Sequence, residues 1–114
     1  MKLKDKLLSP QIIVANVKIL GVECSIKRLS AERIQIYNDA VNQAQKSENT
    51  EKLNQLSIEL MLDALVDENG NAYSKDELPT YKELMSVHDS ASLIDAVAKV
   101  QRHSVGTIED AEKN

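Results

Sequence analysis

The sequence predicts a small, mainly α-helical domain of four to five helices with a short N-terminal β-hairpin. Three stretches, at roughly 31–46, 51–66 and 90–103, repeat apolar residues every three or four positions, as amphipathic helices do. Residues 13–28 instead alternate apolar and polar side chains on either side of Leu20-Gly21, which is the pattern of two paired strands. These two periodicities together indicate the fold class.

The composition is that of one globular domain. The chain has 114 residues, of which 42% are hydrophobic, and a net charge of −4. We expect a single domain over residues 1–106 and a flexible, acidic tail over 107–114. The negative charge argues against non-specific binding to nucleic acid or to an anionic membrane, because both need clustered Lys and Arg. The lone Cys24 predicts no internal disulfide and a reducing, cytoplasmic setting.

The N-terminal part is predicted to run from a basic lead into the hairpin. Residues 1–11 can form one helical turn, which Pro10 would end. Gly21 can adopt the positive φ of a tight hairpin turn. Because an isolated hairpin is marginally stable in water, its apolar face should pack on the helices.

Cap residues place the starts of the helices. Ser30 is the expected N-cap of the first long helix, Asn49 or Thr50 of the second, and Asp89 or Ser90 of the last. The first two helices should pack as antiparallel neighbours because the loop between them is short.

Two capping boxes follow the break at Asn69-Gly70. Ser74 with Glu77 and Thr80 with Glu83 have the required spacing. They predict a one-turn helix at 75–78 and a second short helix at 81–87, with Pro79 between them.

The 51–66 helix is apolar on most of its circumference. Its first apolar face consists of Leu53, Leu56, Leu60 and Ala64, and its second of Ile58, Met61, Leu62 and Leu65. Such a helix must be covered on two sides, by its own domain or by another protein. We therefore predict a partner-binding surface with six residues: Ile58, Met61, Leu62, Leu65, Leu84 and Met85. The same residues could form internal core, and the sequence leaves both readings open.

No catalytic, cofactor or metal site is predicted. Residues 67–71 superficially suggest a calcium loop, but Gly70 is fourth in the run, whereas the EF-hand pattern needs a sixth-position glycine. His88 and His103 have no ligand at metal-site spacing, and Cys24 is expected to be a small core residue. Glu59 and Asp63 share a helix strip that we expect to be solvated. The chain is not expected to be an enzyme.

The order of motifs resembles that of phage tail assembly chaperones. A strand pair leads through the sequence Val22–Arg33, VECSIKRLSAER, into the first long helix. A leucine-rich helix, a Val-Asp-Glu-Asn-Gly turn and a capped short helix follow over Leu60–Leu78. The last helix, Leu93–Val100, matches in place and length. The resemblance covers about residues 14–105 and lies in turn chemistry and element order.

The resemblance implies a function in building the tails of long-tailed phages. A chaperone of this family would bind and solubilise the tape measure protein, self-associate while doing so, act in the host bacterial cytoplasm and be absent from the finished virion. A longer product made by programmed frameshifting would recruit the tail tube protein. The codons of Glu112-Lys113-Asn114 can form an uninterrupted run of A, on which a ribosome could slip.

A small acidic regulatory or inhibitor protein is the alternative function. Such a protein would bind a host or phage partner through its carboxylate-rich surface. It should be a monomer whose partner binding weakens with salt, whereas the chaperone should form oligomers and bind its partner in moderate salt.

Overall fold

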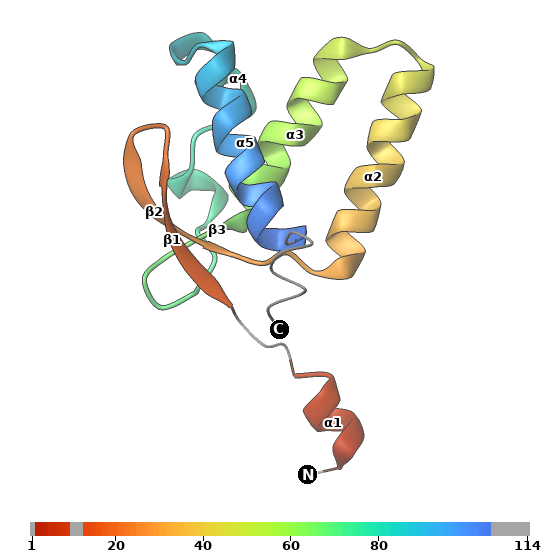
Figure 1. The fold of residues 1–114 in the computed structure, drawn as a ribbon, viewed down its shortest axis with the longest axis vertical. Helices are drawn as coiled ribbons and strands as arrows, with labels where there is room; N and C mark the ends of the chain where they lie inside the picture. The colour runs from red at the N-terminus through yellow and green to blue at the C-terminus, as the bar shows by residue number, and fades with distance from the viewer. Residues whose placement is uncertain (1, 10–12, 106–114) are drawn as a thin grey trace.

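Five helices, a three-stranded sheet and one short 3₁₀ turn make up the described part of the chain, residues 2–9 and 13–105 of a computed structural model (Figure 1). The predicted mainly α fold is therefore confirmed. The predicted tail at 107–114, the end of the predicted domain at 106 and the helix stop at Pro10 lie outside the described residues. Along the chain the elements are α1 (Leu3–Leu7), β1 (Val14–Ile19), β2 (Val22–Lys27), α2 (Ala31–Lys46), α3 (Thr50–Ala64), β3 (Leu65–Val66), η1 (Lys75–Glu77), α4 (Tyr81–Val87) and α5 (Ser90–Val105).

The hairpin is present where the alternating pattern predicts it. β1 and β2 are antiparallel, with Val14 opposite Lys27 and Ile19 opposite Val22. Gly21 has a φ of 82°, as predicted, and Leu20 before it also has a positive φ of 51°. Two consecutive residues with positive φ match the right-handed twist of the flanking strands.

The prediction that the second long helix continues to residue 66 is wrong. α3 ends at Ala64, and Leu65–Val66 form β3, which pairs with Ile26 and Ser25 of β2. The apolar pattern suits either state at these two positions. Pairing with the free edge of β2 favours the strand. It gives hydrogen-bond partners to backbone N–H and C=O groups that would have none at the end of a helix.

The predicted caps are confirmed. The Ser30 side chain accepts a hydrogen bond from the Arg33 N–H at 3.1 Å, and Asn49 does the same for Lys52. Asp89 caps α5 through the Ser92 N–H at 2.7 Å. Both capping boxes form, ahead of η1 and of α4.

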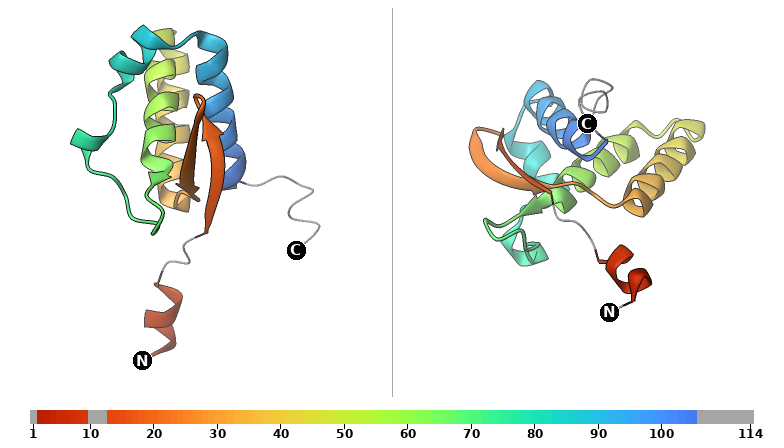
Figure 2. Two further views of the ribbon diagram at one scale, coloured as in Figure 1. Left: turned by 90° about the vertical axis from the view of Figure 1, so that its left-hand side faces the viewer. Right: turned by 60° about the horizontal axis from the view of Figure 1, so that its bottom comes forward.

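α3 lies at the centre of the helical layer. It packs against α2, α4 and α5, while the hairpin packs on α5, so that helices and sheet share one core (Figure 2). The antiparallel packing of the first two long helices is thus as predicted. The largest fully buried side chains are Ile26, Leu60, Met61, Val66 and Val100.

Polar contacts join separate elements at two places, and a third contact lies within α5. The Lys99 ammonium donates to the Lys18 carbonyl at 2.8 Å, joining α5 to β1. Arg33 of α2 pairs with Asp63 of α3, with an N–O distance of 2.8 Å. Within α5, the Lys99 ammonium pairs with the Asp95 carboxylate one turn earlier, at an N–O distance of 3.1 Å.

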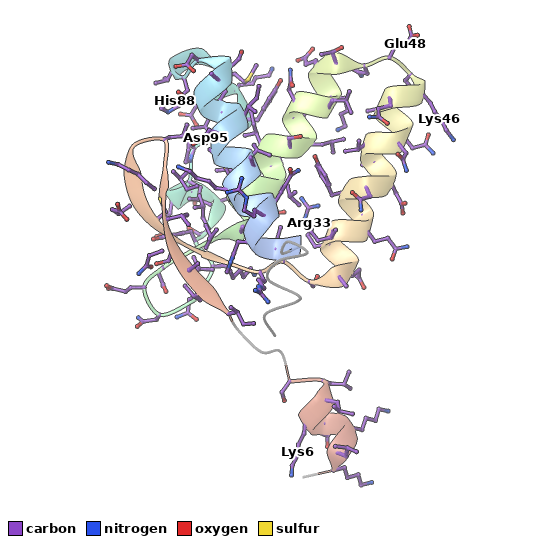
Figure 3. All side chains as sticks on the ribbon, viewed as in Figure 1. Lys6, Arg33, Lys46, Glu48, His88 and Asp95 are labelled. Atoms are coloured by element: carbon purple, nitrogen blue, oxygen red, sulfur yellow. The ribbon has the colours of Figure 1, made fainter. Side chains whose placement is uncertain are left out.

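α1 stands apart from the rest of the structure in every view (Figures 1 and 2). Its leucines Leu3 and Leu7 are 70% and 75% exposed, Leu8 directly after it is 71% exposed, and no residue of the helix is buried. Figure 3 shows its side chains, Lys6 among them, with no other element beside them. Among the described helices, none is long and apolar enough to cross a membrane.

Candidate functional site

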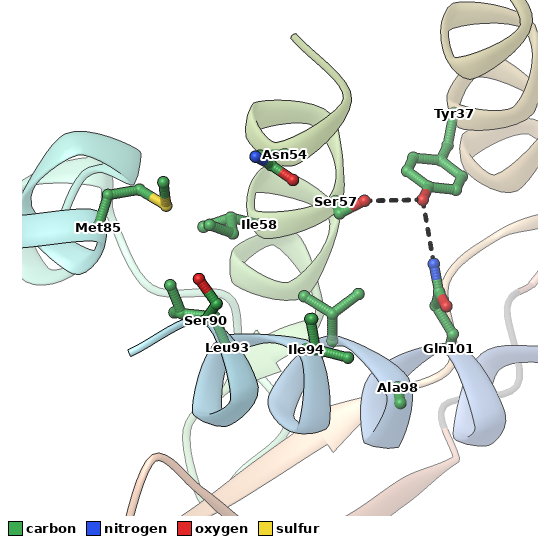
Figure 4. A pocket seen from close by; sticks show the side chains of 11 residues that line it. Tyr37, Asn54, Ser57, Ile58, Met85, Ser90, Leu93, Ile94, Ala98 and Gln101 are labelled. Carbon is green, nitrogen blue, oxygen red and sulfur yellow. Dashed lines mark hydrogen bonds between the residues drawn. The ribbon is translucent and has the colours of Figure 1, made fainter. Parts of the chain in front are cut away.

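A groove between α3 and α5 is the candidate functional site (Figure 4). We call it the interhelical groove. Its volume of about 410 Å³ lies within the range of roughly 300–1,000 Å³ that is usual for ligand pockets. It is lined by Tyr37, Asn54, Ser57, Ile58, Met85, Ser90, Leu93, Ile94, Val97, Ala98 and Gln101.

The lining of the interhelical groove has a polar end at Tyr37, Ser57 and Gln101, and Asn54 and Ser90 add two polar side chains among the apolar ones elsewhere. At the polar end the Tyr37 hydroxyl hydrogen-bonds Ser57 at 3.0 Å and accepts from the Gln101 amide at 3.1 Å, so one side chain links α2, α3 and α5. The floor is formed by Ile58 and Leu93, which are buried.

The rim of the groove holds two large apolar side chains that are exposed to water. Ile94 of α5 is 69% exposed and Met85 of α4 is 40% exposed. An apolar floor with exposed apolar rims and no lining charge is suited to apolar side chains of a helix laid along it.

The six residues predicted for partner binding do not form one surface. Ile58 and Met85 meet in the interhelical groove, one on its floor and one on its rim. Met61 and Leu84 are buried in the core, at 1% and 7% exposure. Leu62 is half-buried against the core, and Leu65 lines a separate hollow beside β2 and β3. Contact between any of the six and a partner stays a prediction.

Ile94 is the exposed apolar residue of the groove that the predicted partner-binding set does not include. The helical period places Ile94 with Leu93 and Val97 on the apolar stripe of α5, which by itself predicts a buried side chain. Leu93 is buried as expected and Val97 partly so, whereas Ile94 lies outside the covered sector. The sequence feature that could have indicated an exposed Ile94 is the width of the apolar stripe on α5, which is broader than one neighbouring helix can cover.

The residues considered for metal binding and catalysis are placed apart. In the described part of the chain, no three His, Cys, Asp or Glu side chains are arranged to hold a metal ion. Asp67 accepts hydrogen bonds from the N–H groups of Asn69 and Asn71 and so closes a turn. Burial raises the pKa of the Cys24 thiol, which keeps it protonated and unreactive at neutral pH.

Comparison with known families decides the class of this protein. The family model described as "Phage tail assembly chaperone protein, TAC" matches residues 2–114. The chain belongs to the phage tail assembly chaperone family. The resemblance stated from the sequence is confirmed.

A solved tail assembly chaperone, that of bacteriophage HK97, has the same fold. It aligns with a TM-score of 0.52 at 17% sequence identity, covering 87% of this chain and 95% of that chain. The search of curated proteins gave no significant match. The family membership therefore rests on the match to the family model, and the similarity to the HK97 structure supports the fold alone.

Proposed function

We propose that this tail assembly chaperone binds and solubilises the tape measure protein during tail assembly, using the interhelical groove. The observation that carries the proposal is the apolar rim formed by Ile94 and Met85 over a buried apolar floor. A helical segment of the tape measure protein would lay its apolar side chains between them, in the helix-in-groove mode. Family membership supports a tail protein as the partner.

Solubilisation follows from mass action. Each occupied groove lowers the population of free, aggregation-prone client. Several copies that self-associate along one long client would add avidity, because later binding events occur at high effective concentration. Such a protein acts without catalysis, in the host cytoplasm, and leaves before the virion is complete. A longer frameshifted product would bring the tail tube protein to the same client.

Co-expression tests the proposed function. Fragments of the tape measure protein from the same phage or prophage are expressed with and without this chain. We expect the soluble fraction of at least one fragment to rise with the wild-type chain and to stay low with Ile94→Asp, which puts a charge on the groove rim.

Ile36→Asp is the matched control. Ile36 is also an exposed isoleucine on a helix, at 54%, and it does not line the groove. This variant should solubilise the fragment as well as wild type does. Fragments that stay equally insoluble with and without the wild-type chain would contradict the proposed function, and equal loss with both variants would contradict the groove as its site.

A further inference from the structure

The α1 arm, residues 2–9, has an apolar face against which no other described element packs. Leu3 and Leu7 are one helical turn apart and so share a side, with Leu8 next to them. All three are at least 70% exposed. A helix of five residues is not stable in water without packing. The arm therefore needs an apolar surface to stay helical.

The interhelical groove offers a surface of matching size and character. Its floor and its rim are apolar, and its volume of about 410 Å³ accommodates a few side chains. The exposed Ile94 and Met85 at its rim lack cover, as the arm leucines do. Packing the arm leucines against the groove rim would remove both apolar surfaces from water.

Charge favours the same pairing. The arm carries three lysines and one aspartate, whereas residues 13–105 carry ten Lys and Arg against fourteen Asp and Glu. At the α4 end of the groove, Glu51 lines the adjoining hollow together with Met85, and Lys82 also lies there. Asp89 directly precedes Ser90 of the groove lining. A basic arm is attracted to an acidic body before any apolar contact forms.

We propose that the α1 arm of one copy of this chain packs its leucine face into the interhelical groove of a second copy. The arm lies at the end of the molecule opposite α4, away from the α4 end of its own groove (Figures 1 and 2). The inference rests on the proposed function, because it gives the client groove a second occupant. This arm–groove contact and client binding then compete for one surface, so the contact belongs to the free protein and is separate from any contact between copies bound along one client.

Three full-length variants test the arm–groove contact by sedimentation velocity over a concentration series. The arm variant is Leu3→Asp/Leu7→Asp, the groove variant is Ile94→Asp, and Ile36→Asp is the control. We expect wild type and the control to self-associate with increasing concentration. The arm and groove variants should each raise the dissociation constant by more than about tenfold. Circular dichroism confirms that each variant is folded, and Met85→Glu replaces Ile94→Asp if that variant loses helix content.

Mixing the two defective variants gives the sharper result. The arm variant retains an intact groove, and the groove variant retains an intact arm, so together they can form one contact. A one-to-one heterodimer in the mixture supports the proposal. A mixture of folded, monomeric variants overturns it, and so does an arm variant that self-associates like wild type or a wild-type chain that is monomeric throughout.

Two further measurements separate this proposal from its competitors. If the arm were a membrane anchor, wild type but not the arm variant would sediment with anionic phosphatidylserine vesicles, and self-association would be unchanged by the arm substitutions, which overturns the proposal. In the co-expression assay the arm variant should solubilise the tape measure fragment at least as well as wild type. If neither wild type nor the arm variant solubilises the fragment, the proposed function fails. The sedimentation data still decide whether the arm–groove contact exists.

Discussion

Glu48 holds the left-handed backbone conformation that usually belongs to glycine. Its φ is 53°, and it lies in the turn between α2 and α3 (Figure 3). The Asn49 N–H donates to the Ala44 carbonyl at 2.9 Å and the Glu48 N–H to the Gln45 carbonyl at 3.1 Å. This is a Schellman motif, in which glycine is preferred at the position of Glu48 because a Cβ is strained there.

Glu48→Gly should raise the free energy of unfolding by roughly 0.5–1 kcal/mol, since relief of strain exceeds the entropy that glycine adds to the unfolded chain. Gly21→Ala is the opposite case. The added Cβ would meet no atom within 4 Å but would be held at a φ of 82°, so it should lower stability by about 1 kcal/mol. Urea denaturation measures both. Equal effects of the same sign would contradict the conformational explanation.

The Asp89 cap should make the free energy of unfolding depend on pH. Hydrogen bonds from the N–H and hydroxyl of Ser92 hold the pKa of Asp89 below its ordinary value. A carboxylate with a lowered pKa stabilises the folded state above its unfolded pKa, and this contribution is lost as pH falls through the folded value.

Asp89→Asn keeps a good N-cap but cannot titrate. The stability difference between wild type and Asp89→Asn should therefore shrink as pH falls from about 6 to about 2. Denaturation curves at several pH values check this, and a difference that stays constant over this range would contradict it.

At the scale of elements, local chemistry accounts for what the sequence predicts. Ser30, Asn49 and Asp89 cap their helices through contacts three residues away, so that the starts of α2, α3 and α5 can be read from short stretches. β3 could not be predicted in this way. Its two residues leave the helix because of Ser25 and Ile26, some forty residues earlier in the chain, and no local pattern records that pairing.

Alanine substitutions at the two methionines proposed for partner binding should lower the free energy of unfolding by different amounts. Met61→Ala should cost about 2–5 kcal/mol, because the side chain is 1% exposed and its loss leaves a cavity in the core. Met85→Ala should cost less than about 1 kcal/mol, since this side chain is 40% exposed. Thermal or urea denaturation measures both. Similar losses would mean that the groove rim is as important to the monomer as its core.

At the scale of the whole molecule, the candidate site could be predicted in part. Ile58 and Met85 were expected to contact a partner and do line the groove, while Met61 and Leu84 have the same apolar character but are buried in the core. Sequence shows how much apolar surface needs cover. Which residues remain uncovered depends on how α4 and α5 pack on α3, and that is a property of the assembled fold.

Removal of residues 2–9 should leave the stability of the monomer unchanged within about 0.5 kcal/mol. These residues are all exposed, and the described hydrogen bonds of α1 are internal to the arm. Denaturation at the lowest workable protein concentration measures the difference. A larger loss would show that the arm packs on its own domain.

The hydroxyl of Tyr37, bonded to both Ser57 and Gln101, also gives the interhelical groove an optical signature. The chain contains three tyrosines and no tryptophan. Near-ultraviolet circular dichroism of the free protein therefore comes largely from tyrosine, and an occupant that parts α2 from α5 would change the Tyr37 band. A client peptide that contains one tryptophan can be excited at wavelengths too long to excite tyrosine. Its fluorescence then reports the environment of the bound peptide, because this chain contributes no tryptophan emission.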